Sequence, residues 1–416
     1  MNPSPTSTTF PTQTIDTVQV QRMERLLQAA DPQHLTDFFS PQELADAGHG
    51  PGRAASLAAR FAAKEACLKL FPRETSLGRI DLYDFAIHRS PVGAPAVHPS
   101  PVARAVMDQH RVREIHVSLT HSRESATATV QAQPNPIHVP WYGKALYKIF
   151  PYRRHVVLGN LRRAFGHSLP ESEIVRIAQA YSGHFLKFLY EFFRLPFMSK
   201  AKRQAWIRIE NIDSPVNAHN QGKGIILLTG HYGNFEVATV AGIGQFPQYK
   251  GVFYFVRRPL KPELLNKFVK WRFRRAGFGT LPQRGSLDAI LDLLNQGAII
   301  VYPFDQHAVA KDGVTVDFFG HPAGTHKSVA LLALSTGAPV IPASSWREPD
   351  GSHVLRFEDP IPTIQHDNVS EAIRLNTQAY NDVLERLVLR HPEQWIWMHK
   401  RWKPQPKRKR RKRQGS

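Results

Sequence analysis

The sequence contains a single cysteine, Cys67, among its 416 residues. One cysteine excludes an intrachain disulfide and a cysteine-rich zinc site, and it fits a reducing compartment. Long apolar runs are also missing, because every apolar stretch is far shorter than the ~18 residues needed to cross a bilayer. Residues 1–11 are rich in Ser, Thr and Pro and lack the basic start and apolar core of a signal peptide. We therefore expect any membrane contact to be peripheral.

Acidic residues are scarce as well, with 34 Asp and Glu against 54 Lys and Arg, a formal net charge of +20. Residues 407–413 are seven consecutive Lys or Arg, so the chain without them still carries +13, that is 20 minus 7. This balance favours anionic partners: nucleic acid, acidic lipid, an acidic carrier protein or a phosphorylated cofactor. The basic tail, residues 404–416, is typical of a solvated chain end or of a contact with an anionic surface.

Three prolines in residues 132–140 (AQPNPIHVP) indicate an extended connector between two domains. We predict a first domain at 12–132, a linker at 133–140 and a second domain at 141–403. The first shows helical patterns at 19–30 and 53–71. Its strand patterns fall at 80–88, 114–119 and 126–130. This mixture predicts an α+β domain.

The second domain contains four continuous apolar runs, at 224–230, 251–256, 297–303 and 339–345. Continuous rather than alternating apolar runs are typical of strands covered on both faces. Helical patterns lie between them, so we predict an α/β domain with a mostly parallel sheet. Ser168 and Glu171 also predict a capping box at the start of a long helix.

The helix at 53–71 aims a carboxylate at the buried side of the first domain. Leu57, Phe61 and Glu65 lie in line at intervals of four residues, and Lys69 follows one turn later. A buried carboxylate needs a cation, which Mg²⁺ or Lys69 could supply. The alternative is a Glu65–Lys69 pair on a solvated face.

Residues 12–132 resemble the holo-acyl-carrier-protein synthases, a family of 4′-phosphopantetheinyl transferases. The resemblance is carried in order by segments 15–23 (IDTVQVQRM), 39–44 (FSPQEL), 60–66 (RFAAKEA) and 116–122 (HVSLTHS). It implies Mg²⁺-dependent transfer of phosphopantetheine from coenzyme A to a serine of an acyl carrier protein, in a homotrimer.

The resemblance also implies roles for particular residues. Asp16 and Glu65 would hold Mg²⁺, and Glu65 would further assist removal of the serine proton through a water. Lys69, Ser118 and His121 would contact coenzyme A, while Arg22 would meet the acidic carrier helix. The family's glycines before the aspartate and after the lysine are few here, in segments 12–15 and 71–78. A non-catalytic module that docks the carrier is therefore an alternative.

His231 follows directly on the apolar run 225–230, at the strand end where open α/β sheets bind ligands. Glu236, five residues on, is expected to reach back to one imidazole nitrogen and to leave the other as a base. A structural histidine beside a glutamate is the alternative reading of the pattern alone.

Segment 230–236 (GHYGNFE) resembles the His-x4-Asp/Glu motif of the lysophospholipid acyltransferase superfamily, in the form found in the late acyltransferases of lipid A biosynthesis. The resemblance covers 140–403 and includes segments 151–154, 160–165, 257–259, 305–306, 318–320 and 395–402. It implies that His231 deprotonates an acceptor that attacks an acyl thioester, with Glu236 orienting the imidazole.

Substrate-binding roles are implied for Gly233 and Asn234 in the same motif. Arg257 and Arg258 would bind a phosphate, with ordinary surface charge as the alternative, and Asp305 and Gln306 would shape the acceptor pocket, with a structural role in a loop as the alternative. That family has a membrane-spanning helix before 151–154, where this chain has only residues 141–150 (WYGKALYKIF). An amphipathic interfacial helix at the inner membrane is expected instead.

Together the resemblances predict a bifunctional transferase in which one domain charges a carrier and the other discharges it onto a lipid or glycolipid. Acyltransferase activity alone, with a docking domain, is the second hypothesis. The third, a nucleic-acid-binding protein acting through the basic tail, is disfavoured because no binding motif accompanies the tail.

Overall fold

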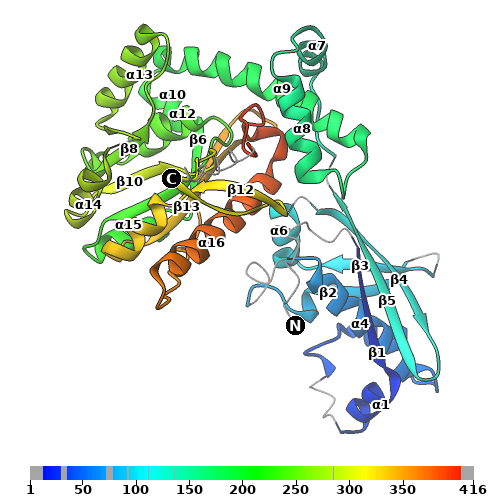
Figure 1. Cartoon of the computed structure of the whole chain (residues 1–416). Helices are drawn as coiled ribbons and strands as arrows, with labels where there is room; N and C mark the ends of the chain where they lie inside the picture. Colours follow the sequence, from blue (N-terminus) through cyan, green and yellow to red (C-terminus); the bar gives the residue numbers. More distant parts are fainter. Residues whose placement is uncertain are drawn as a thin grey trace, which may run out of the picture. The chain divides into compact units, whose positions relative to one another are not determined.

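The computed structural model describes residues 13–29, 35–71, 78–90, 93–110, 112–134, 136–283 and 285–403. The N-terminal residues 1–11, most of the segment 71–78 and the basic tail 404–416 lie outside these ranges. The described chain divides into two compact units, one that ends at Pro136 and one that begins at Ile137 (Figure 1). Strand β5 (Ser125–Pro134) extends two residues into the connector predicted at 133–140.

The N-terminal unit is built on a three-stranded antiparallel sheet with the strand order β1-β5-β4. Strand β1 spans Gln13–Gln19 and β4 spans Val112–His121. The remaining elements are helices α1 (Val20–Ala29), α3 (Pro41–Ala47), α4 (Arg53–Lys69) and α6 (Pro101–Gln109), the 3₁₀ turn η1 (Leu82–Asp84), and the hairpin of β2 (Phe85–Arg89) and β3 (Pro95–Pro99). The predicted α+β class is confirmed.

Helix α4 packs closely on this sheet because small residues face each other across the contact. Ala58, Ala59, Ala62 and Ala63 of α4 and Ala126 and Ala128 of β5 belong to one buried cluster. The helix also buries a charge, since Lys64 is 0% exposed and lies 2.8 Å from Glu43 of α3. The Glu43 carboxylate further accepts the backbone N–H groups of Ser40 and Ile87. The fully buried charge on α4 is thus Lys64, whereas Glu65 is half-buried.

The C-terminal unit contains a seven-stranded sheet with the order β6-β14-β13-β7-β10-β8-β9, in which only β13 and β14 pair antiparallel. The four predicted apolar strands are confirmed as β7 (Ile225–Thr229), β8 (Phe253–Arg257), β10 (Ile299–Pro303) and β13 (Val340–Arg347). Strands β6 (Ile207–Glu210), β9 (Gly279–Pro282) and β14 (His353–Phe357) complete the sheet, and β11 (Gly313–Phe318) and β12 (His321–His326) form a separate hairpin.

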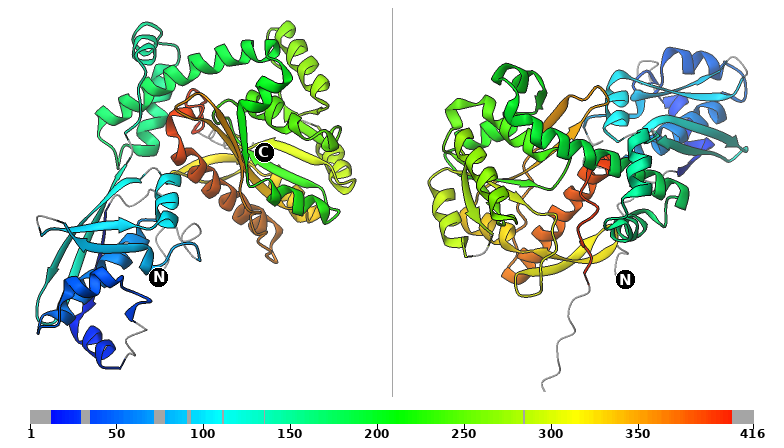
Figure 2. Two further views of the ribbon diagram at one scale, coloured as in Figure 1. Left: turned by 180° about the vertical axis from the view of Figure 1, so that it is seen from behind. Right: turned by 90° about the horizontal axis from the view of Figure 1, so that it is seen from above.

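Helices cover both faces of this sheet (Figure 1 and Figure 2). Ile226 and Leu228 of β7 join one buried cluster, and Ile225 and Leu227 join another on the opposite face. The first cluster is closed by α8 (Arg154–Phe165), α9 (Glu171–Arg194), α14 (Leu287–Asn295), α15 (Ser328–Thr336) and α16 (Val369–Arg390). The second is closed by α11 (Asp213–Asn220), the π-helical segment η3 (Ala238–Gly242) and α13 (Glu263–Ala276).

Two details concern expectations about individual helices. The capping box predicted for α9 is wrong: the residue before the helix is Pro170, and the Ser168 hydroxyl instead donates to the Phe165 carbonyl.

Helix α7 (Trp141–Ile149) forms where the interfacial helix was expected, with Trp141 79% and Ile149 78% exposed. Among the described residues, no helix has both the length and the apolar character needed to cross a membrane.

Candidate active sites

Two carboxylates from different elements meet in the N-terminal unit. Asp16 of β1 is hydrogen-bonded to Glu65 of α4, and Lys69 Nζ lies 2.6 Å from Asp16 Oδ2. The Thr17 backbone N–H donates to Asp16 Oδ1, and the Thr14 hydroxyl donates to the Ala66 carbonyl, which ties β1 to α4 beside the pair. The structure therefore brings together three of the residues predicted from the sequence.

The pKa values of the two carboxyls move apart because their environments differ. Burial raises the pKa of Glu65, and the neighbouring Asp16 raises it further, against the charges of Lys69 and Arg22. Burial also disfavours charge on Asp16, but hydrogen bonds from Lys69 and Glu65 outweigh it and lower the pKa of Asp16. Such a pair holds a proton that a divalent cation can displace, and its hard oxygen donors suit Mg²⁺.

Of the predicted coenzyme A contacts, Lys69 lies beside this pair, whereas Ser118 and His121 do not. Register places Ser118 opposite Thr129, which pairs with Ile15, so Ser118 lies on the sheet face opposite Asp16. His121 lies opposite Ala126 on the same face as Asp16, but two strands away, and its side chain is exposed. Within one copy of the chain, Ser118 and the two carboxylates therefore lie on opposite faces of the sheet.

In the C-terminal unit, strand register assembles a histidine and an aspartate. Strands β7 and β10 are parallel neighbours that pair Thr229 with Pro303, and a polar residue follows two positions after each of these paired residues. These residues are His231 and Asp305. The His231 Nδ1–H donates to Asp305 Oδ1 at 2.9 Å, and the His231 backbone N–H donates to Oδ2 at 2.7 Å. Trp395 Nε1 also donates to Oδ2, at 2.9 Å, so the 1% exposed carboxylate is fully satisfied.

The charges of this pair reinforce each other. Burial opposes an imidazolium, but the charge and hydrogen bond of Asp305 outweigh it and raise the pKa of His231. Burial likewise opposes the carboxylate, yet His231 and Trp395 hold the pKa of Asp305 at about 2. With Nδ1 protonated by this contact, Nε2 remains as the basic nitrogen.

The predicted contact between Glu236 and His231 is wrong. Asn234 caps the short helix α12 (Phe235–Val237), and Glu236 then points toward α13, where its Oε2 lies 3.4 Å from Arg272 Nη2. Burial raises the pKa of Glu236, although Arg272 and Arg257 partly offset it. Asp305, expected to shape the acceptor pocket, takes the orienting position instead.

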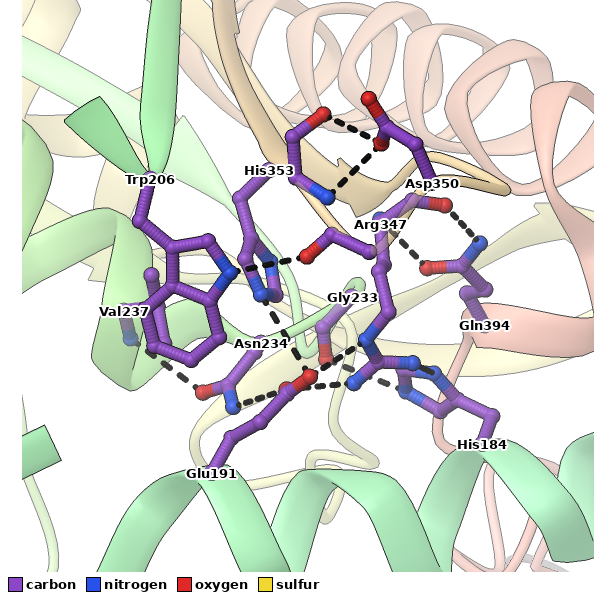
Figure 3. Close-up of polar contacts among 12 residues, drawn as sticks. His184, Glu191, Trp206, Gly233, Asn234, Val237, Arg347, Asp350, His353 and Gln394 are labelled. Carbon is purple, nitrogen blue, oxygen red and sulfur yellow. Dashed lines mark hydrogen bonds and ion pairs between the residues drawn. The ribbon is translucent and has the colours of Figure 1, made fainter. Parts of the chain in front are cut away.

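Gly233 and Asn234 are also not in the substrate-binding positions expected of them, because both are hydrogen-bonded to side chains of helix α9 (Figure 3). The Asn234 side chain is 0% exposed and donates to Glu191 Oε2 at 2.9 Å. Gly233 has φ 51°, and a Cβ there would lie 2.4 Å from the Ser345 carbonyl oxygen. The close approach explains why glycine occupies this position.

A buried polar network anchors that turn to α9 and β13. Arg347 donates to both oxygens of Glu191 at 2.7 and 2.5 Å, and its Nη1 donates to His184 Nδ1 at 3.0 Å (Figure 3). His184 Nε2 then donates to the Gly233 carbonyl at 3.1 Å. Burial and Arg347 lower the pKa of His184 to about 3, so it is neutral. Burial opposes the Glu191 charge, but His353 and Arg347 hold its pKa at about 2.

His231 and Glu236 line a pocket of about 430 Å³. Its apolar wall includes Phe188, Leu227, Phe255, Val301 and Leu355, while Arg257, Arg258 and Gln306 supply polar groups at its lining. Arg257 Nη2 donates to Asn266 at 3.2 Å, and Arg258 Nε donates to Gln283. This lining fits an acyl chain together with a polar or charged portion of a substrate.

Sequence reasoning missed Glu191, Arg347 and Arg272. Glu191 and Arg347 lie 156 positions apart, so no local spacing connects them. The available signal was a glutamate within the aromatic stripe of α9, between Phe188 and Phe192, because a charge among buried aromatics requires a partner.

A histidine base held by a buried aspartate above an apolar pocket, together with a separate domain carrying paired carboxylates, defines a two-domain transferase. A family model for bacterial lipid A biosynthesis acyltransferases matches residues 140–404, and one for the 4′-phosphopantetheinyl transferase superfamily matches residues 14–130. The chain belongs to both families.

Individual relatives agree with this division. Phosphatidylinositol mannoside acyltransferase of Mycolicibacterium smegmatis is 28% identical over 251 residues, covering 58% of this chain and 77% of the relative. Holo-[acyl-carrier-protein] synthase of Syntrophus aciditrophicus is 35% identical over 116 residues, covering 28% of this chain and 90% of the relative. A solved Helicobacter pylori holo-[acyl-carrier-protein] synthase in complex with coenzyme A is 27% identical and covers 29% of this chain and 99% of its own, with a TM-score of 0.25.

Proposed function

We propose that the chain transfers 4′-phosphopantetheine from coenzyme A to an acyl carrier protein, and transfers an acyl group from a carrier thioester to a lipid or glycolipid. The observation that carries the proposal is the His231–Asp305 pair at an apolar pocket, in a chain that also carries the Asp16–Glu65 pair. Phosphopantetheine carries acyl chains as thioesters, so the first product is the carrier of the second reaction's donor.

In the phosphopantetheinyl domain, Asp16 and Glu65 are the groups that would hold Mg²⁺. A bound ion would neutralise charge on the pyrophosphate of coenzyme A, where the phosphopantetheinyl group passes to the serine oxygen and adenosine 3′,5′-bisphosphate leaves. Among the described residues, no third His, Cys, Asp or Glu joins this pair. Lys69, beside Asp16, supplies a cation for a phosphate, and exposed Arg22 on α1 faces the acidic carrier.

We propose that this domain acts as a homotrimer, with coenzyme A between copies. The support is the placement of Ser118 on the sheet face opposite the carboxylates. Ile15 lies on that outward face and is 59% exposed, so a second copy packed on this face would cover it. Ser118 of one copy could then share a ligand with Asp16 and Glu65 of another.

In the acyltransferase domain, His231 Nε2 takes the proton of an acceptor hydroxyl, and the oxygen attacks the thioester carbonyl. The tetrahedral intermediate collapses, the carbon–sulfur bond breaks, and the thiolate receives the proton from Nε2. Asp305 keeps the other proton on Nδ1 throughout and stabilises the imidazolium. Glu236 acts at the pocket wall with Arg272, not as the partner of the imidazole.

A peripheral position at the inner membrane is part of the proposal. Helix α7 exposes Trp141 and Ile149, and the adjoining Phe150 and Tyr152 are 54% and 56% exposed. Exposed aromatic residues next to lysines favour the interface of a bilayer. This surface would bring the acyltransferase pocket to a lipid acceptor.

Two single substitutions test the two activities separately. Glu65→Ala should abolish Mg²⁺-dependent labelling of an apo carrier by fluorescent coenzyme A, whereas Glu24→Ala, at an exposed position on α1, should not. His231→Ala should abolish thiol release from acyl carrier thioesters in the presence of a lipid extract, whereas exposed His138→Ala should not. Wild-type protein that labels no apo carrier would refute the first activity, and full thiol release by His231→Ala would refute the second.

A further inference from the structure

A second pocket in the C-terminal unit is lined by five cationic side chains. It has a volume of about 510 Å³ and lies between α10 (Lys200–Ala205), the segment after β7 and α13. Helix α10 supplies Lys200 and Arg203, and α13 supplies Arg272 and Arg275. The turn before β8 supplies Lys250. Among the residues that the structure describes, no Asp or Glu lines it. A pocket of this size can hold a phosphate together with a larger attached group.

These cations lack enough counter-charge within the protein. Of the five, only Arg272 has a carboxylate within 4.0 Å among the described residues, namely Glu236 at 3.4 Å. Burial lowers the pKa of Arg272, and the positive charge of Arg203 lowers it further, against the opposing charge of Glu236. Arg272 is buried, whereas the other four line the pocket from half-buried or exposed positions, and a bound anion would lower the repulsion among these like charges.

Arg272 provides a second, independent observation. It is 5% exposed, and although its Nη2 lies 3.4 Å from Glu236 Oε2, neither Nη1 nor Nη2 makes a hydrogen bond among the described residues. Its guanidinium lies 4.9 Å from the Phe192 ring centroid and 5.7 Å from that of Phe268, which fixes its orientation. Buried donors without an acceptor are costly, and oxygens of a ligand in this pocket would satisfy them.

The rim of the pocket is apolar and accessible. Trp271 lines it, is 44% exposed and lies under Arg275 at 5.5 Å. Phe197, in the segment between lining residues Pro196 and Met198, is 90% exposed. Aromatic side chains at a basic pocket favour a ligand that combines an anionic head with apolar carbon.

We propose that this pocket binds the phosphate group of an amphiphilic phosphate ester, at a site separate from the His231 pocket. Phosphate fits better than a carboxylate because several cations converge and a phosphate group presents more acceptor oxygens to them than a carboxylate does. Two sources share this chemistry: a phospholipid headgroup and the phosphopantetheine arm of a thioester donor.

The site borders the reaction pocket. Ile243 lines both, and the ion pair of Arg272 with Glu236 joins a residue of one lining to a residue of the other. A phosphate beside Arg272 would place a negative charge near the Glu236 carboxylate at the wall of the reaction pocket. The binding itself stands on the pocket's own geometry and does not require acyl transfer.

The test uses the full chain and two charge-matched double variants. Arg203→Gln/Arg275→Gln removes two cations of the pocket, whereas Lys202→Gln/Arg274→Gln removes two exposed cations from the same helices that do not line it. Binding is measured to phosphatidylcholine vesicles with and without phosphatidic acid, and to 4′-phosphopantetheine in solution. Any binding in the N-terminal unit is common to both variants and cancels in the comparison.

The proposal predicts that the pocket variant binds at least one of the phosphate probes about tenfold or more weakly than the control variant. Loss with vesicles identifies the lipid headgroup, and loss with 4′-phosphopantetheine identifies the donor arm. Equal affinities of the two variants for both probes would overturn the proposal. Lys200→Gln, at an exposed position, gives a single-site check that leaves the core untouched. Because no turnover is measured, failure of acyl transfer would leave this result intact.

Discussion

Asp305→Asn isolates the role of the carboxylate that holds His231. Asp305 Oδ2 accepts two N–H groups, from the His231 backbone and from Trp395, at 2.7 and 2.9 Å. An asparagine must keep its carbonyl oxygen in that position, because its NH₂ group cannot accept. The NH₂ group therefore turns toward His231 Nδ1, which must then accept a hydrogen bond. The proton moves to Nε2, and the imidazole can no longer act as the base.

The expected loss in kcat is about 10³- to 10⁴-fold, the size of effect when a histidine base is held in the wrong tautomer. A change in pH dependence accompanies it. Asp305 raises the pKa of His231 above the ordinary value of about 6.5, so the wild-type rate falls as the pH drops through that raised pKa. In Asp305→Asn the carboxylate charge is gone, so burial lowers the pKa of His231. The acid limb of the residual activity should move to lower pH.

The assay follows thiol release from an acyl carrier thioester with a lipid extract as acceptor, between pH 5 and 9. Asp292→Asn, an exposed position on α14, is the matched control and should behave as wild type. Glu236→Gln removes a charge at the wall of the pocket and should lower activity. The pH at which the rate falls on the acid side should stay as in the wild type. A near-normal rate for Asp305→Asn, or an acid limb shifted by Glu236→Gln and not by Asp305→Asn, would show that Asp305 does not hold His231 in its basic tautomer.

Three further predictions concern the turn that carries His231 and the paired carboxylates. Glu191→Gln leaves Arg347 without its buried partner and should lower the free energy of unfolding by about 3–5 kcal/mol in urea titrations. The pKa of Glu191 is about 2 in the folded chain and about 4.3 in the unfolded chain, so the stability difference between wild type and Glu191→Gln should be largest above pH 4.3 and should fade as the pH falls toward 2. A stability difference that does not depend on pH would contradict this. Gly233→Ala should lower the melting temperature and abolish acyl transfer, since its Cβ meets the Ser345 backbone at 2.4 Å; a stable, active variant would show that the turn can yield. Mg²⁺ affinity, measured by calorimetry, should rise with pH through the raised pKa of Glu65 with release of about one proton, and Glu65→Ala should remove that proton release.

The sheet of the C-terminal unit could be predicted because its central strands are apolar on both faces. The runs that became β7, β8, β10 and β13 needed no knowledge of their neighbours. Strand β1 could not be recognised from its composition, since QTIDTVQ alternates half-buried and exposed residues and contains three Thr or Asp side chains. Its identity as a strand depends on β5, more than one hundred residues away.

The site shows the same division between local and distant information. His231 follows an apolar strand, so its place at the sheet edge could be predicted from the local sequence. The partner of its Nδ1 could not, because the contact with Asp305 depends on the register of β7 with β10, 74 positions away. Spacing alone favoured Glu236, but helix α12 turns that side chain toward Arg272. Tertiary packing decided between two carboxylates that the sequence could not separate.

Whether one chain both charges a carrier and discharges it is measured most directly by the intact mass of the carrier. The full chain is incubated with Mg²⁺, an acyl-coenzyme A, an apo carrier and a lipid extract. We expect conversion of the apo carrier to the acylated form and then to the free-thiol holo form. His231→Ala should stop at the acylated carrier, and Glu65→Ala should leave the carrier apo. A carrier that stays apo with the wild-type chain, or an acylated carrier that persists equally with wild type and His231→Ala, would show that the chain does not carry out both transfers.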